Sequence, residues 1–233
     1  MDAALHILVG LVPIVLICVM VYLRDRARPE KPMHLLITFV LGAVAALPAY
    51  FIEQQIDNYG WQNSIEFIPY TLYMFLGVAL VEELFKYLPV VLYPFQRSFF
   101  DEPLDGIVYC VFAAMGFAVV ETVVYAPMLD WEGVLAKATL TIPAHAAFAM
   151  IAGYFLGRAR TPSVTQRGKY VLLGLFWAVI AHGLYDWFVF NPYAEWMTLL
   201  AVVVLFVCWF VAMRLTAKHA LGPDPTPLAS GRA

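Results

Sequence analysis

Ionisable side chains lie inside long apolar stretches of this sequence. In chain order they are Glu82, Glu83, Lys86, Glu121, His145, His182 and Asp186. An Asp, Lys or Arg at the centre of a membrane-spanning helix costs roughly 2.5 to 3.5 kcal/mol on insertion scales. A chain that carries several such groups is expected to gather them around an internal cavity, where they satisfy one another. These residues therefore form a candidate functional site.

Helical spacing predicts which of these side chains meet. Lys86 follows Glu82 by four residues and Glu83 by three, so its ammonium can reach either carboxylate. Successive residues of a helix point about 100° apart, so we expect one glutamate to face the cavity and the other to pair with Lys86 or to cap a polar contact. His182 and Asp186 are four residues apart and share a helix face.

Carboxylates and imidazoles in a water-poor cavity are suited to activating water. A glutamate can take a proton from water and return it to a leaving amine, and a histidine can stabilise the developing oxyanion. Alternatively, His145 and His182 with a carboxylate such as Glu121 could bind Zn²⁺, which lowers the pKa of bound water. The sequence has no H-E-x-x-H motif, so it leaves the metal-dependent and metal-free alternatives open.

Apolar helices must position these groups. The chain has 233 residues, of which 63% are hydrophobic and 13% charged, whereas a typical soluble domain is about 25% charged. This composition predicts an all-α polytopic membrane protein, and the net charge of −3 without a basic patch excludes a nucleic-acid partner. Stretches of about 20 residues can cross a bilayer, and seven qualify: 5–23, 34–54, 67–91, 105–127, 136–157, 169–190 and 195–214.

The predicted spans form one transmembrane domain over residues 1–214, with the candidate site within about 66–190. Gly153 and Gly157 are spaced for close helix packing. The tail 215–233 is rich in proline and glycine and is predicted to be disordered.

Charge predicts the orientation of this bundle. Of the 14 Lys and Arg residues, twelve lie in or beside 24–33, 94–104, 158–168 and the tail. Lys137 instead flanks an outer connection, and Lys86 lies within a span. Because basic residues accumulate on the cytoplasmic side, we expect the N-terminus outside and the C-terminus in the cytoplasm.

Four short motifs follow one another on successive predicted spans. They are E-E-x-x-K at Glu82–Lys86, F-x-x-x-E at Phe117–Glu121, P-A-H at Pro143–His145 and H-x-x-x-D at His182–Asp186. In order and spacing they resemble the PrsW family of bacterial intramembrane proteases, which is related to CAAX-prenyl endopeptidases and bacteriocin-processing membrane proteases. The resemblance covers roughly residues 78–188.

The resemblance implies a peptidase of the bacterial cytoplasmic (inner) membrane. Its substrate would be a membrane-embedded or membrane-proximal protein, such as an anti-sigma factor. The resemblance leaves open whether the enzyme is of the glutamic type or a zinc-dependent metallo type with His145, His182 and Glu121 as ligands. One glutamate of the Glu82–Glu83 pair would activate water, and the remaining implied site residues are Glu121, His145, His182 and Asp186, with Lys86 and Phe117 in support.

Other functions also use intramembrane ionisable residues. Chains of Asp, Glu and His mark ion pathways, so a proton- or ion-coupled transporter is the main alternative. The sequence has no internal repeat and no pair of Gly/Pro-broken spans, which counts against a transporter. A non-catalytic membrane scaffold or immunity protein, in which the charges form structural ion pairs, is a third interpretation.

Overall fold

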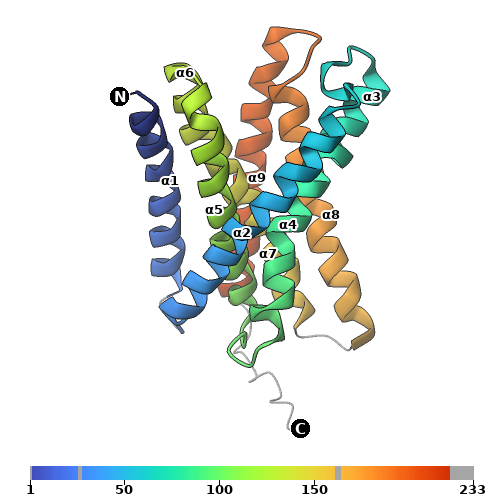
Figure 1. Ribbon diagram of the computed structural model, residues 1–233. Helices are drawn as coiled ribbons and strands as arrows, with labels where there is room; N and C mark the ends of the chain where they lie inside the picture. Colours follow the sequence, from blue (N-terminus) through green and yellow to red (C-terminus); the bar gives the residue numbers. More distant parts are fainter. Residues whose placement is uncertain (1, 26–27, 161–163, 221–233) are drawn as a thin grey trace.

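The computed structural model describes residues 2–25, 28–160 and 164–220. Over these residues the chain forms helices and connections without strands, which confirms the predicted fold class (Figure 1). The six longest helices are α1 (Asp2–Arg24), α2 (Pro32–Asp57), α5 (Pro103–Tyr125), α7 (Ile142–Ala159), α8 (Val164–Val189) and α9 (Thr198–Ala220).

Short helical elements complete the bundle. The π-helix η2 (Tyr73–Ala79) joins α3 (Phe67–Leu72) to α4 (Leu80–Leu92), and the π-helix η5 (Lys137–Thr141) joins α6 (Trp131–Ala136) to α7. Single 3₁₀ turns are η1 (Trp61–Asn63), η3 (Pro94–Gln96), η4 (Ala126–Met128) and η6 (Glu195–Met197).

Six helical segments of the described chain are long and apolar enough to cross a membrane. They are Ala3–Arg24, Pro32–Asp57, Pro103–Met128, Trp131–Ala159, Gln166–Val189 and Glu195–Ala217. The remaining predicted span, 67–91, is observed as the helical run α3–η2–α4, whose apolar character is interrupted by Glu82, Glu83 and Lys86. The chain is a multi-pass membrane protein. Helix α9 continues to Ala220, and the rest of the predicted tail, 221–233, lies outside the described residues.

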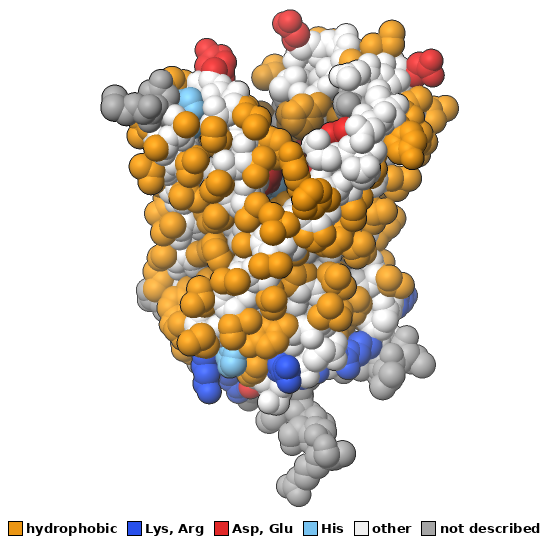
Figure 2. Space-filling model, viewed as in Figure 1, with side chains coloured by type: hydrophobic (Ala, Val, Ile, Leu, Met, Phe, Trp, Pro, Cys, Tyr) orange, Lys and Arg blue, Asp and Glu red, His pale blue; other side chains and the backbone are white. Residues whose placement is uncertain are grey.

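The surface has the charge asymmetry expected of a membrane bundle. Large apolar side chains such as Leu16, Phe51 and Phe206 are more than half exposed, in positions where lipid would cover them. In Figure 2 they form a broad belt, with Asp and Glu at one end of the bundle and Lys and Arg at the other. We refer to these as the acidic end and the basic end.

Glycines bring α5 and α7 into backbone contact at the centre of the bundle. A Cβ atom on Gly153 would lie 2.4 Å from the Gly106 carbonyl oxygen, and one on Gly157 would lie 2.0 Å from that of Pro103. A larger residue at either position would push the two helices apart. The predicted close packing at Gly153 and Gly157 is therefore confirmed, and α5 and α7 pack closely against each other.

Candidate functional site

The ionisable residues predicted from the sequence meet within the acidic half of the bundle. Four helices contribute to the cluster, and five of its side chains, from Glu83, Lys86, His145, His182 and Asp186, are at most 6% exposed. Helix α4 carries Glu82, Glu83 and Lys86, α5 carries Glu121, α7 carries His145, and α8 carries His182 and Asp186. The structure thus brings every predicted site residue into one buried cluster, which we call the α4–α8 cluster.

Lys86 lies at the centre of this cluster. Its Nζ is 2.7 Å from Glu82 Oε2, 3.0 Å from Glu83 Oε1 and 2.9 Å from His145 Nδ1, so all three ammonium protons have an acceptor. The same nitrogen lies 4.8 Å from the centroid of the Phe117 ring, within the range of a cation–π contact. Lys86 thus pairs with both glutamates at once, because its long side chain reaches between the two carboxylates.

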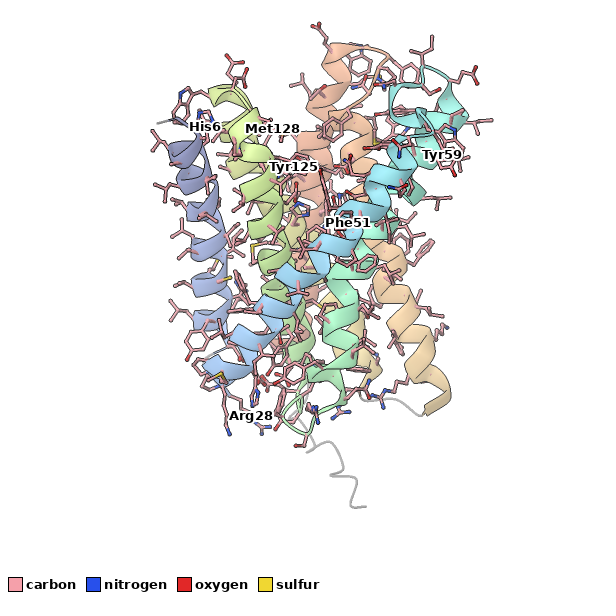
Figure 3. All side chains as sticks on the ribbon, viewed as in Figure 1. His6, Arg28, Phe51, Tyr59, Tyr125 and Met128 are labelled. Carbon is pink, nitrogen blue, oxygen red and sulfur yellow. The ribbon has the colours of Figure 1, made fainter. Side chains whose placement is uncertain are left out.

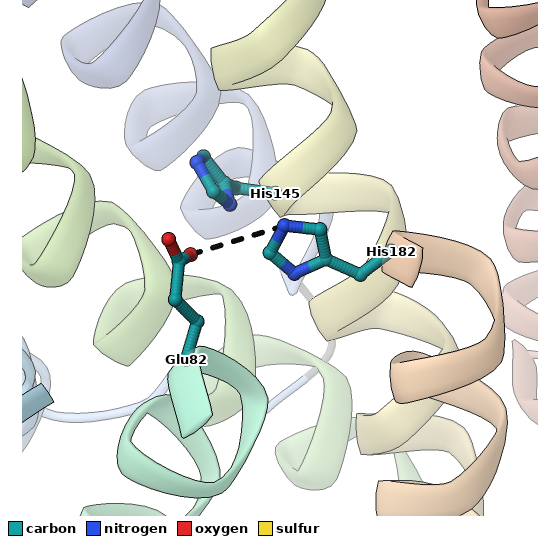
Figure 4. A group of neighbouring side chains, drawn as sticks. All are labelled: Glu82, His145 and His182. Carbon is teal, nitrogen blue, oxygen red and sulfur yellow. Dashed lines mark ion pairs between the residues drawn. The ribbon is translucent and has the colours of Figure 1, made fainter. Parts of the chain in front are cut away.

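His182 is held by carboxylates on both ring nitrogens. Its Nδ1 is 2.8 Å from Glu83 Oε1, and its Nε2 is 3.0 Å from Asp186 Oδ2. The Nε2 atom also lies 3.9 Å from Glu82 Oε2, the contact dashed in Figure 4. Asp186 is 6% exposed, so it belongs to the buried site.

Glu121 links α5 to α7 and to η5. Lys137 Nζ donates to Glu121 Oε1, and His145 Nε2 lies 2.9 Å from Glu121 Oε2. The latter pair is close but not aligned for a hydrogen bond, so both buried atoms lack a hydrogen-bond partner among the described residues. The sequence assigned Lys137 to the flank of an outer connection, whereas the structure buries it to 8% exposure as the counter-ion of Glu121.

Three of these side chains could hold a metal ion. Glu82, His145 and His182 each offer a ligand atom, and the three atoms lie within 4.8 Å of one another (Figure 4). Two imidazoles and a carboxylate are a common zinc donor set. A metal-binding histidine usually donates its other ring N–H to a carboxylate that orients it, and Glu83 is in this position at Nδ1 of His182. The sequence favoured Glu121 as the carboxylate ligand, while the structure puts Glu82 in the triad and Glu121 beside it.

A small pocket leads to these carboxylates between α2, α4 and α5. Its lining includes Glu53, Glu82 and Glu121, with Tyr50 and Tyr125 toward the acidic end. Figure 2 shows the surface hollowed toward the acidic end, with acidic side chains visible inside, and Figure 3 labels the lining residue Tyr125 in the same view. The buried Oε1 of Glu53 has no hydrogen-bond partner among the described residues. The site residues predicted from the sequence did not include Glu53, because this residue lies next to the predicted end of its span.

Two π-helical segments lie directly before the site residues. η2 ends at Ala79, three residues before Glu82, and η5 ends at Thr141, four residues before His145. A π-turn adds a residue to the helical turn and rotates the side chains that follow, and such segments are frequent at functional sites. The helix periodicity of the sequence gave no sign of this rotation.

Comparison with known proteins identifies relatives over nearly the whole chain. Residues 30–213 match the model of the PrsW family intramembrane metalloprotease. A protein named Protease PrsW from Geobacillus kaustophilus is 30% identical over 226 residues, covering 96% of this chain and 97% of the relative. Proteins of the same name from Oceanobacillus iheyensis and Bacillus subtilis are 31% and 29% identical, covering 88% and 86% of this chain and 91% and 89% of the relatives. No solved structure matches the chain. These comparisons give no support to the transporter alternative.

Proposed function

The chain belongs to the PrsW family of membrane proteases, and we propose that it hydrolyses a peptide bond of a membrane-embedded or membrane-proximal protein at the α4–α8 cluster. The observation that carries this proposal is the buried convergence of Glu82, His145 and His182 beside a pocket lined by Glu121. An anti-sigma factor with an extracytoplasmic part is the class of substrate that the family resemblance suggests.

We assign Glu82, His145 and His182 as ligands of a zinc ion. The His145 Nε2 and Glu121 Oε2 atoms, buried and without hydrogen-bond partners, fit a site that gains a further polar partner when loaded. When bound, Zn²⁺ would lower the pKa of a water molecule and polarise the scissile carbonyl. Glu83 would hold the His182 ring in place through Nδ1.

Glu121 is placed to move the proton in this reaction. Glu121 lines the pocket, with Oε2 beside His145 and with Lys137 on Oε1. We propose that Oε2 takes a proton from the attacking water and returns it to the leaving amine. Lys86 balances the charge of the two glutamates on α4. Asp186 pairs with His182 Nε2, the nitrogen that would bind the metal, so zinc would take the place of this contact.

A glutamic mechanism in the same pocket is the second candidate. Glu82 lines the pocket, whereas Glu83 is 2% exposed and held by Lys86 and His182. Without a metal, Glu82 is therefore the glutamate of the pair with access to water, and it would be the base.

We also propose that the acidic end faces the outside of the bacterial inner membrane. The separation of acidic and basic side chains in Figure 2 matches the rule that basic residues stay in the cytoplasm. The N-terminus would then be outside, and the pocket at Tyr125 and Glu53 would open toward the outer leaflet. Labelling of single cysteines introduced near Glu132 and near Arg28, with a membrane-impermeant reagent on intact cells, tests this topology.

Cleavage of a single-pass reporter in liposomes tests the activity. We expect wild-type protein to cleave it, and Glu82→Gln, Glu121→Gln and His182→Ala to lose cleavage. Glu132→Gln, an exposed carboxylate on α6, is the matched control that keeps activity. Full activity in all three site variants would contradict the proposed site.

Metal content separates the two mechanisms. In the zinc mechanism, purified wild-type protein contains about one zinc per chain and loses activity on chelation. Glu82→Gln and His182→Ala then lose the metal, whereas Glu121→Gln retains it and is inactive. Cleavage by metal-free protein would establish the glutamic mechanism instead.

A further inference from the structure

A second buried acidic cluster lies at the basic end of the bundle. It joins the connection between α1 and α2, which carries Asp25 and Glu30, to the start of α5, which carries Glu102 and Asp105. Asp25, Glu30 and Asp105 are 1%, 7% and 0% exposed. Asp105 and Glu121 are sixteen residues apart on α5, which separates the two sites by about 24 Å at 1.5 Å per residue. We call this group the α1–α5 cluster.

The carboxyl groups of the α1–α5 cluster face one another. Asp25 lies within hydrogen-bonding reach of Glu102, and Glu30 within that of Asp105. The Glu30 backbone N–H donates to Asp25 Oδ2 at 3.1 Å, so Glu30 links the two carboxyl pairs. The Tyr109 hydroxyl, on a fully buried side chain, donates to Glu30 Oε2.

Helix capping accounts for only part of this arrangement. Asp105 Oδ2 accepts the backbone N–H groups of Asp101 and Glu102 at 2.7 and 2.9 Å. The bond with Glu102, together with the Glu102 side chain that accepts the Asp105 N–H, forms a capping box at the start of α5. The other oxygen, Asp105 Oδ1, is buried without a partner, and so is Asp25 Oδ1. A buried carboxylate oxygen without a donor is costly, so these two atoms indicate that the cluster has room for a cation or a further proton.

Basic side chains do not supply that partner within the described part of the chain. None of its ion pairs involves Asp25, Glu30, Glu102 or Asp105. Arg28 acts on Glu102, and Arg160 on Asp105, only through longer-range attraction. The Arg160 guanidinium instead donates to the carbonyl oxygens of Phe100 and Arg97. Figure 3 shows Arg28 at the edge of this end of the bundle.

We propose that the α1–α5 cluster binds a hard divalent cation, Mg²⁺ or Ca²⁺, which fastens the α1–α2 connection to the start of α5. All available ligands are carboxylate and hydroxyl oxygens, and these are the donors that hard cations prefer. No histidine or cysteine belongs to the cluster, in contrast to the α4–α8 cluster. The carboxyl groups form two linked pairs rather than a closed triad, so binding requires them to move toward one another.

The raised pKa values of the carboxyl groups support a site that is stabilised by added positive charge. Burial raises the pKa of Asp25 to about 6 and that of Glu102 to about 7, and repulsion from neighbouring carboxylates adds to both shifts. Burial also raises the pKa of Glu30, while the Tyr109 hydrogen bond opposes the shift. Protons and a divalent cation can each relieve this repulsion. Stabilisation by protons depends on pH, whereas stabilisation by the cation also depends on the metal concentration.

Cation-dependent stability of the full-length protein in detergent or nanodiscs tests the proposal. We expect Mg²⁺ or Ca²⁺ at pH 7.5 to raise the melting temperature of wild-type protein relative to EDTA. The shift should persist in Glu82→Gln, which alters the α4–α8 cluster, and in the surface control Glu132→Gln. It should be lost in Asp105→Asn and Asp25→Asn, whose amides keep the accepting oxygen for the backbone. In EDTA these two variants should melt no lower than wild type, because they remove like charges.

Terbium luminescence reports the location of the cation. Tb³⁺ bound beside Tyr109 should emit on tyrosine excitation, and excess Ca²⁺ should displace it. Tyr109→Phe should reduce the emission while the cation-dependent melting shift remains. Melting temperatures of wild type that are equal in EDTA and in millimolar Mg²⁺ and Ca²⁺ would overturn the proposal, as would a shift that survives in Asp105→Asn and Asp25→Asn. Protonation of the carboxyl groups would then account for the neutralisation of the cluster.

Discussion

The two buried acidic clusters of this protein differ in how their charge is balanced. In the α4–α8 cluster each carboxylate has a cationic or imidazole partner, with Lys86 between Glu82 and Glu83 and Lys137 on Glu121. In the α1–α5 cluster the carboxylates face one another, and no described lysine or arginine pairs with them. Both clusters are buried, and both are held by α5.

The difference is consistent with the roles that we propose for the two clusters. A reaction centre needs its charges fixed before the substrate arrives, because preorganised partners do not have to rearrange as the reaction proceeds. A site with unbalanced charge is instead stabilised when a cation or proton binds to it. Four predictions test this contrast, from the largest expected effect to the smallest.

The largest effect is expected on catalysis at Glu121. Loss of a positioned general base typically costs about 10²- to 10⁴-fold in rate, and we expect this loss in kcat for Glu121→Gln. Reporter cleavage in liposomes measures it, with zinc content and melting temperature as controls for an intact fold. A Glu121→Gln enzyme that retains near wild-type kcat would remove Glu121 from the reaction.

Removal of Lys86 should strongly destabilise the protein. Lys86→Met leaves Glu82 and Glu83 as buried charges without their counter-ion, a change that typically costs about 3–5 kcal/mol. Unfolding by denaturing detergent measures the loss. The double variant Lys86→Met/Glu83→Gln should recover part of the stability, because it removes one of the stranded charges. No recovery would show that packing of the lysine, rather than charge balance, is the main contribution.

Gly157→Ala should disturb the basic end more than the reaction centre. Its Cβ would lie 2.0 Å from the carbonyl oxygen of Pro103, the first residue of α5, so the two helices must separate there. Overpacking of this kind costs about 1–3 kcal/mol, and we expect a reduced cation-dependent melting shift. Gly168→Ala is the matched control, because a Cβ on Gly168 meets no atom within 4 Å. Equal melting temperatures for the two variants would argue against tight packing at Gly157.

The smallest effect is a pH dependence of stability that arises from the α1–α5 cluster. The folded pKa values of about 6 for Asp25 and about 7 for Glu102 exceed the unfolded values of about 3.9 and 4.3. Between these values the folded protein binds more protons than the unfolded chain, so in EDTA its stability should fall as pH rises from about 4 to about 8. Melting curves across this range measure the slope.

Matched variants assign that slope to the cluster. Asp25→Asn and Glu102→Gln should each flatten it, while Glu132→Gln should leave it unchanged. Saturating Mg²⁺ or Ca²⁺ should reverse the trend near neutral pH, since the cation binds the ionised form. A slope that is the same in all three variants would place its origin elsewhere in the chain.

Much of the α4–α8 cluster could be predicted because each helix carries its own local signal. A charge within an apolar run is recognisable without knowledge of the neighbouring helices, and E-E-x-x-K and H-x-x-x-D spacing defines a helix face. Glu53 and Lys137 could not be found in this way. They lie near predicted span ends, where a charge is ordinarily at the membrane surface, and only packing shows that both are directed inward.

The sequence by itself determined the class of molecule, the positions of its spans to within a few residues, the uneven charge of its two ends and the family to which it belongs. These properties follow from local composition and spacing, which one helix displays alone. Only the tertiary structure decided that Lys86 bridges two glutamates, that Glu82 forms a triad with His145 and His182, and that Asp25 and Glu30 meet the start of α5. These contacts depend on how helices rotate and cross, as at the π-helical turns and the glycine contacts of α5 and α7, and no single segment encodes that geometry.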